Sequence, residues 1–259
     1  MTEPCPDALV ALAHRLADAA GAVARRHFRT PIAADTKSNH TPVTIADREA
    51  EQAMRAILAA ERPQDGILGE EHGTAGLDRE YVWVLDPIDG TKSFMTGRPL
   101  FGTLIGLMRG GRPVLGVVDH PALGERWVGG AGHPTALNGR PARVRPCADA
   151  ADAILSATTP DMFAGADAAA FRRVSAACKY TLYGSDCYAY SQLASGFIDL
   201  VVERDLGTWD WAALVPVVEA AGGVMTDWQG RPLALGSPGE VVAAGDPALH
   251  RRALELLAG

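Results

Sequence analysis

Two aspartates, Asp86 and Asp89, stand in the segment DPIDGT, directly after the apolar run YVWVL. Pro87 and Gly90 favour a turn here, so we expect the second carboxylate to return beside the first. Two carboxylates held this close in a partly buried site repel each other, and a cation would relieve the repulsion. A hard divalent ion fits such a pair, and the backbone carbonyl of Ile88 offers a further oxygen ligand. The alternative is an Asx-type turn that binds no metal.

Three further acids stand where they could join this pair. Glu70 follows a short apolar segment and a glycine in GEE (69–71), and Asp210 lies between two tryptophans in WDWAAL (209–214). An aspartate in that setting is not expected to be simply solvated, and it could cap a helix and bind metal together. Asp47, at the start of a predicted helix, could be either a cap or a functional group.

Carboxylates from four separate segments could converge on two or three magnesium ions. Two ions roughly 3.5–4 Å apart can clamp the attacking and leaving oxygens of an in-line phosphoryl displacement. Magnesium usually keeps some of its waters, and one of them could be the nucleophile. We expect Thr91 to orient that water, with Asp47 either accepting a hydrogen bond from the hydroxyl or taking the proton. Helix N-termini near residues 91–93 and 210 would add backbone N–H donors for the phosphate.

The composition is that of an ordinary globular protein. Of the 259 residues, 47% are apolar and 21% are charged, and the formal charge is −7. This acidic balance argues against nucleic-acid and anionic-membrane partners. The N-terminus lacks a signal-peptide pattern, and no apolar run reaches roughly 18 residues, so we expect a cytoplasmic protein without a membrane span. The spacing of the cysteines favours free thiols, and that of the histidines argues against a zinc enzyme.

Hydrophobic periodicity and turn residues predict the elements that must position these acids. The expected helices are 7–28, 46–60, 171–178, 188–195 and 211–221, with a last helix that Asp246 caps. Thr44 and Asp47 should form a capping pair at the second helix. The expected strands are 67–69, 81–85, 104–108, 114–118, 125–129, 154–157, 197–202, 224–227 and 241–244, with a loop or short hairpin at 30–44.

We expect layered α and β elements with a soft boundary near residue 146. An N-terminal α+β subdomain, residues 1–146, would carry most of the metal ligands. A C-terminal α/β subdomain, residues 147–259, would carry Asp210 and the pocket for the leaving group.

Four segments resemble the inositol monophosphatase family of magnesium-dependent phosphatases. They are VTIADREAE at 43–51, GEE at 69–71, WVLDPIDGTKSF at 83–94 and WDWAALVPVVEAAGGVMTDW at 209–228. The resemblance covers nearly the whole chain in order. It implies a layered α+β architecture, the αβαβα sugar-phosphatase fold, usually as a homodimer. It also implies Mg²⁺ as cofactor and a small-molecule phosphate monoester as substrate.

The resemblance implies a role for each matched residue. The implied metal ligands are Glu70, Asp86, the Ile88 carbonyl, Asp89 and Asp210. Asp47 and Thr91 would hold the nucleophilic water, with Glu70 as a third catalytic residue. The implied substrate contacts near the phosphate are Gly90, Thr91 and Asp210. Lys37 matches a catalytic loop of the family.

Within the family, TKSFMTGRPLFGTLIGL (91–107) and GSDCYAYSQLASGFIDLVVE (184–203) are most similar to the histidinol-phosphatase branch. Ser185, Asp186 and Glu203 would then line the leaving-group pocket. A carboxylate there suits histidinol phosphate, which bears an ammonium and an imidazole, better than inositol, which presents only hydroxyls. Asp186 could instead be a turn or cap residue, and Glu203 a solvated edge charge. LGTWDW (206–211) follows the general family form.

Our first hypothesis is therefore an L-histidinol-phosphate phosphatase of histidine biosynthesis. The second is a phosphatase of the same chemistry that acts on inositol or another sugar phosphate. A hypothesis from another class is a non-catalytic regulatory protein on the same fold. The complete set of acids together with Thr91 argues against it, because only catalysis requires all of them.

Overall fold

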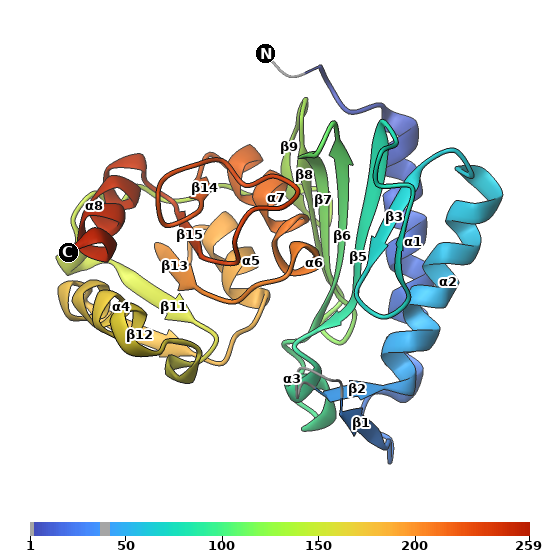
Figure 1. Ribbon diagram of the computed structural model, residues 1–259, viewed down its shortest axis with the longest axis horizontal. Helices are drawn as coiled ribbons and strands as arrows, with labels where there is room; N and C mark the ends of the chain where they lie inside the picture. The colour runs from blue at the N-terminus through green and yellow to red at the C-terminus, as the bar shows by residue number, and fades with distance from the viewer. Residues whose placement is uncertain (1–2, 37–41) are drawn as a thin grey trace.

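The structure is a computed structural model that describes residues 3–36 and 42–259. Figure 1 shows five layers, in the order helices, large sheet, helices, smaller sheet, helices. This arrangement confirms the expected αβαβα fold. No helix in the described part of the chain is both long and apolar enough to cross a membrane.

The first layer consists of α1 (Asp7–His27) and α2 (Ile45–Glu61), which lie along the outer face of the large sheet (Figure 1). Each helix buries one apolar stripe, as the periodicity predicted. The predicted capping pair is present, because the Thr44 side chain accepts from the start of α2 and Asp47 accepts from the Thr44 backbone N–H. Before α2, the short strands β1 (Ala34–Thr36) and β2 (Pro42–Thr44) pair antiparallel.

The large sheet has eight strands and is antiparallel except where β3 lies parallel to β5. Its order is β10 (Arg140–Pro141), β9 (His133–Leu137), β8 (Glu125–Gly130), β7 (Arg112–His120), β6 (Gly102–Arg109), β5 (Tyr81–Asp89), β3 (Gly66–Gly69) and β4 (Gly73–Ala75). The sheet includes the predicted hairpin as β6 and β7. The sequence did not predict β4, β9 or β10, which are short strands at the two edges of the sheet.

Strand β5 corrects one expectation about the acidic turn. The strand does not stop at Leu85 but continues through Asp89, with a shift of register between Asp86 and Asp89. Asp86 pairs with Leu104 and Asp89 with Gly102. Pro87 has no N–H to donate to the ladder, so the chain bulges and then rejoins β6.

The smaller sheet has five strands and mixes parallel with antiparallel pairs. Its order is β12 (Tyr180–Tyr183), β11 (Ile154–Ala157), β13 (Leu200–Glu203), β15 (Val241–Ala244) and β14 (Val224–Thr226). Helices α4 (Gly165–Ala177) and α8 (Pro247–Ala258) cover its outer face (Figure 1). Asp246 caps α8 as predicted, whereas α4 begins earlier and β13 begins later than expected.

The central layer contains α5 (Tyr188–Ala194), α6 (Thr208–Trp211) and α7 (Leu214–Ala220). The expected single helix at 211–221 is wrong, since the chain forms α6 and α7 with a break at Ala212 and Ala213. Pro216 explains the break, because its ring clashes with the carbonyl four residues earlier, which is that of Ala212. One buried apolar cluster joins this layer to both sheets; its members include Val84, Trp211 and Val241. All four cysteines are free thiols, as expected.

The break between α6 and α7 lies directly against the large sheet. Gly106 and Gly116 pair across β6 and β7. A Cβ built on Gly116 would lie 1.9 Å from the Ala213 carbonyl oxygen, and one built on Gly106 would lie 3.0 Å from Ala212. The two glycines therefore let the backbone that carries Asp210 approach the sheet.

We predict that Gly116→Ala lowers the free energy of unfolding by about 3 kcal/mol, the upper end of the range for overpacked interiors. The added methyl group meets a backbone oxygen that cannot rotate away. Gly106→Ala is the matched control and should cost clearly less, because its contacts are an ångström longer. Denaturant melts of both variants measure the difference, and equal losses would contradict the prediction.

Candidate active site

The pairing of β3 with β5 brings the first two acids together. The strands are parallel with Gly69 opposite Leu85, and the Glu70 N–H donates to the Leu85 carbonyl over 3.1 Å. Because Gly69 pairs with Leu85, Glu70, the first residue after β3, lies beside Asp86 within β5. Both line one pocket of about 200 Å³.

The bulge in β5 then places Asp89 next to Asp86. The Ile88 N–H donates to Asp86 Oδ1 over 3.0 Å, which is the Asx-type contact that the sequence offered as the alternative to a metal site. The Asx-type contact and the acidic cluster therefore coexist, since this contact is local and leaves Asp86 within the cluster.

Asp210 completes the cluster from the central layer. It is the third residue of α6, where its Oδ2 accepts from the Gly207 N–H over 2.6 Å. It therefore makes the N3 half of a capping box, since the N-cap residue Gly207 has no side chain to return the second hydrogen bond. One carboxylate oxygen from each of Asp86, Asp89 and Asp210 lies within 4.8 Å of the other two.

One backbone N–H orients each of these three carboxylates. Ile88 donates to Asp86, Cys187 donates to Asp89 Oδ2 over 2.8 Å, and Gly207 donates to Asp210. Each acid keeps a second oxygen for another partner. This donor set, hard carboxylate oxygens at short mutual distance, is the kind that Mg²⁺ prefers.

The electrostatics of the cluster favour a bound cation. Burial raises the pKa of Asp86 well above its ordinary value, and repulsion from Glu70, Asp89 and Asp210 raises it further. Burial also raises the pKa of Asp210 well above its ordinary value, with Asp89 and Glu70 adding to the effect. The pKa of Asp89 rises to about 7, from burial first and then from Asp186. At neutral pH the protein alone therefore resists full ionisation of these acids.

Thr91 lines the first pocket, and Asp47 lies beside it at the start of α2. The Thr91 hydroxyl is 3.4 Å from Asp47 Oδ1 and 3.2 Å from the Ile88 carbonyl oxygen, so it can donate to either. Asp47 Oδ2 accepts from the Thr44 backbone and hydroxyl. Burial raises the pKa of Asp47, although the Thr44 hydrogen bonds oppose the rise. The sequence therefore predicted correctly that Asp47 is near Thr91, and Asp47 also serves as a cap.

Of the residues predicted for the leaving-group pocket, Asp186 and Glu203 line a pocket in the structure and Ser185 does not. Asp186 and Glu203 line a second pocket of about 130 Å³, which shares Asp89 and Asp210 with the first. Glu203 is 3% exposed, and its two oxygens accept from the Thr158 N–H and the Tyr190 hydroxyl, so it is not a solvated edge charge. Ser185 lies in the same loop as Asp186 but lines neither pocket.

Several residues that line or support the acidic pocket were not identified from the sequence. Glu51 is fully buried on α2 and accepts from the backbone N–H groups of Glu71 and His72, which holds the segment after β3 in place. Its position on the same helix face as Asp47 was the available signal. Lys92 and Thr158 also line the first pocket. Lys92 stands beside Thr91 in the motif and could have been noticed, whereas nothing local indicates Thr158.

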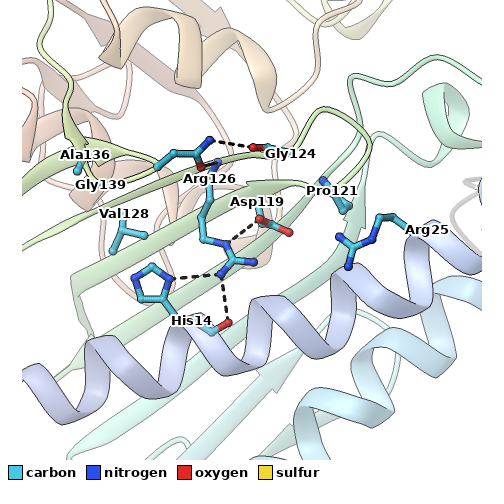
Figure 2. Close-up of a pocket in the computed structure, with 10 residues that line it drawn as sticks. His14, Arg25, Asp119, Pro121, Gly124, Arg126, Val128, Ala136 and Gly139 are labelled. Carbon is cyan, nitrogen blue, oxygen red and sulfur yellow. Dashed lines mark hydrogen bonds and ion pairs between the residues drawn. The ribbon is translucent and has the colours of Figure 1, made fainter.

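Lys37 lies outside the described residues. Figure 2 shows a separate pocket of about 330 Å³ between α1 and the β7–β8 hairpin. Its central cation, Arg126, is paired with Asp119 and Asp18. None of the predicted site residues in the described part of the chain lines it, so it is not a candidate for the chemistry above.

The chain is similar to known phosphatases over nearly its whole length. A family model described as the inositol monophosphatase family matches residues 6–259. The chloroplastic bifunctional phosphatase IMPL2 of Arabidopsis thaliana is 47% identical over 260 residues, which cover 97% of this chain and 75% of the relative. The histidinol-phosphatase of Chlorobaculum parvum is 34% identical over 240 residues, 92% of each chain. A solved inositol monophosphatase from Zymomonas mobilis is 49% identical with a TM-score of 0.91, and the match covers 99% of this chain and 100% of that one.

We predict that Mg²⁺ stabilises the protein and that the effect grows with pH. Without metal, Asp89 has a pKa of about 7 when folded against 3.8 when unfolded. Between these values the folded state binds the extra proton, so the stability of the metal-free protein falls as pH rises. At 100 times its Kd, Mg²⁺ should add about 2.7 kcal/mol at pH 8, or roughly 5–10 °C in Tm.

Thermal melts with Mg²⁺ or with a chelator, at pH 5 and pH 8, measure this effect. The Mg²⁺-dependent shift should be smaller at pH 5, where more of the acids are protonated. Asp86→Asn should remove most of the shift at both pH values. A shift that Asp86→Asn leaves intact would place the metal elsewhere.

Proposed function

This chain belongs to the inositol monophosphatase family, and we propose that it is a Mg²⁺-dependent enzyme that hydrolyses L-histidinol phosphate to L-histidinol and phosphate. The observation that carries the choice of substrate is the second pocket, beside the acidic cluster. Its lining includes the carboxylates of Asp89, Asp186, Glu203 and Asp210 and no lysine or arginine among the described residues. With Mg²⁺ on Asp89 and Asp210, the carboxylates of Asp186 and Glu203 would remain to favour a leaving group with an ammonium over one with only hydroxyls.

In this proposal, Asp86, Asp89 and Asp210 hold two or three Mg²⁺ ions together with Glu70 and the Ile88 carbonyl. The short distances among the three aspartates and their raised pKa values support this fit. Bound Mg²⁺ would neutralise the carboxylates and stabilise charge on the attacking and leaving oxygens of an in-line displacement.

The residues of the chain would activate and position the reactants. Thr91 would accept a hydrogen bond from the nucleophilic water while donating to Asp47, and Asp47, with Glu70, would take the proton. Gly90 and Thr91 would contact the phosphate, since both line the pocket at the start of α3 (Thr91–Met95). The leaving oxygen would depart toward the second pocket, where Asp186 and Glu203 receive the cationic part of histidinol.

The similarity to the inositol monophosphatase from Zymomonas mobilis favours a second candidate, an inositol or other sugar-phosphate phosphatase with the same chemistry. The two candidates differ only in the leaving-group pocket. A non-catalytic regulatory protein is the candidate from another class, and Mg²⁺-dependent phosphate release from any monoester would exclude it.

A substrate panel with Mg²⁺ tests the proposed function. The panel contains L-histidinol phosphate, inositol 1-phosphate, fructose bisphosphate and adenosine bisphosphate, and the measured quantity is kcat/KM. We expect L-histidinol phosphate to rank first by at least about tenfold, equivalent to 1.4 kcal/mol. A higher kcat/KM for inositol 1-phosphate would transfer the assignment to the second candidate.

We predict that Thr91→Ala and Asp47→Asn each lower kcat by roughly a hundredfold or more, the range for losing a positioned acid–base group. KM should change less than kcat, because neither side chain is expected to anchor the leaving group and the backbone at Gly90 would still contact the phosphate. The double variant should be scarcely worse than either single variant, since the two residues act on one water. Steady-state kinetics of the three variants test this, and multiplicative losses would contradict a shared role.

We predict that Asp186→Ala lowers kcat/KM for L-histidinol phosphate by roughly 10- to 100-fold, the range for a lost hydrogen bond to a charged group. The loss for inositol 1-phosphate should be much smaller, because inositol offers no ammonium. Asp152→Ala, which removes an exposed aspartate outside both pockets, is the matched control. Equal losses on the two substrates would remove the basis for preferring histidinol phosphate.

A further inference from the structure

Asp186 forms a shared wall between the two pockets. It precedes α5 in a loop with a left-handed backbone, φ +47°, which few residues other than glycine, asparagine and aspartate adopt. Its carboxylate lies against Gly90, because a Cβ built on that glycine would be only 2.8 Å from Asp186 Oδ2. The Asp186 side chain therefore has little room to move toward α3.

Three hydrogen bonds hold this loop against the acidic motif and the segment that follows it. Ser93 Oγ donates to Asp186 Oδ2 over 2.6 Å, and Arg98 donates to the Gly184 carbonyl over 3.0 Å. The Cys187 N–H donates to Asp89. Of these contacts, only the one from Ser93 reaches the Asp186 carboxylate itself.

Ser93 is suited to fixing that carboxylate. It is 4% exposed on the short helix α3, so its hydroxyl is shielded from water that would compete for the hydrogen bond. It holds Oδ2 only, and Oδ1 accepts no hydrogen bond within the part of the chain that the structure describes. A carboxylate with one oxygen held and the other open loses less rotational freedom when it binds a ligand than one that swings freely.

We infer that Ser93 is a positioning residue for substrate specificity, which fixes Asp186 so that its open oxygen receives the ammonium of the leaving group. This inference rests on the proposed function, and it adds a residue that lines neither pocket. It predicts that the hydroxyl of Ser93 matters for cationic substrates and not for phosphate monoesters with neutral leaving groups.

The test compares two substrates in the Mg²⁺-loaded enzyme, L-histidinol phosphate and glycerol 2-phosphate. Ser93→Ala should raise KM for L-histidinol phosphate by about tenfold, equivalent to 1.4 kcal/mol, with kcat changed by less than about threefold. KM for glycerol 2-phosphate should stay within about twofold of wild type. Thr96→Ala is the matched control, because it removes a hydroxyl beside the same helix. Among the described residues, that hydroxyl bonds only to the backbone carbonyls of Lys92 and Ser93.

A double-mutant cycle separates positioning from a general structural role. In an Asp186→Ala background, Ser93→Ala should raise KM for L-histidinol phosphate no further, since the carboxylate it positions is gone. A further tenfold loss there, or equal losses on the two substrates, would overturn the inference while leaving the proposed function intact. A wild-type enzyme without preference for L-histidinol phosphate would overturn both.

Ser93→Cys provides a second variant if Ser93→Ala fails to fold. The thiol keeps the approximate shape of the side chain but is a weak donor, so we expect a KM for L-histidinol phosphate between those of wild type and Asp186→Ala. A wild-type KM in Ser93→Cys, with the fold confirmed by circular dichroism, would show that the hydrogen bond does not position Asp186.

Discussion

Mutual repulsion among Asp86, Asp89 and Asp210 is the constraint on which the rest of the site depends. Their oxygens approach within 4.8 Å in a buried setting that raises the pKa of each acid. Such a cluster is stable at neutral pH only with partners that favour the charged forms. One backbone N–H per carboxylate supplies part of that compensation, and divalent cations would supply the remainder.

The surrounding fold can be understood as the means of holding this unfavourable cluster together. The parallel β3–β5 pair brings Glu70 beside Asp86, and the bulge at Pro87 returns Asp89 to the same place. From the central layer, Gly106 and Gly116 let the backbone near Asp210 approach the sheet. The strand pair, the bulge and the two glycines each bring backbone segments close together. The site therefore depends on main-chain packing more than on flexible side chains.

The same acids that would bind metal also shape the choice of leaving group. Asp89 and Asp210 line both pockets, and Asp186 forms the wall between them. With Mg²⁺ bound to Asp89 and Asp210, a leaving group that carries positive charge would meet the remaining carboxylates of Asp186 and Glu203. The proposed catalytic and specificity residues would thus interact electrostatically. Hydrogen bonds from Ser93 to Asp186 and from Thr158 and Tyr190 to Glu203 limit how these two carboxylates move.

The sequence by itself determined the local features: the helices that have clear apolar stripes, the capping box from Thr44 and Asp47, the closeness of Asp86 to Asp89, and the family from its motifs. These depend on residues within a few positions of each other, so spacing and residue type suffice. Only the tertiary structure decided that β5 continues through its bulge, that Glu51 anchors the segment after β3, and that Ser93 meets Asp186, 93 positions away. Such contacts are set by how distant layers pack, and no local pattern encodes that packing.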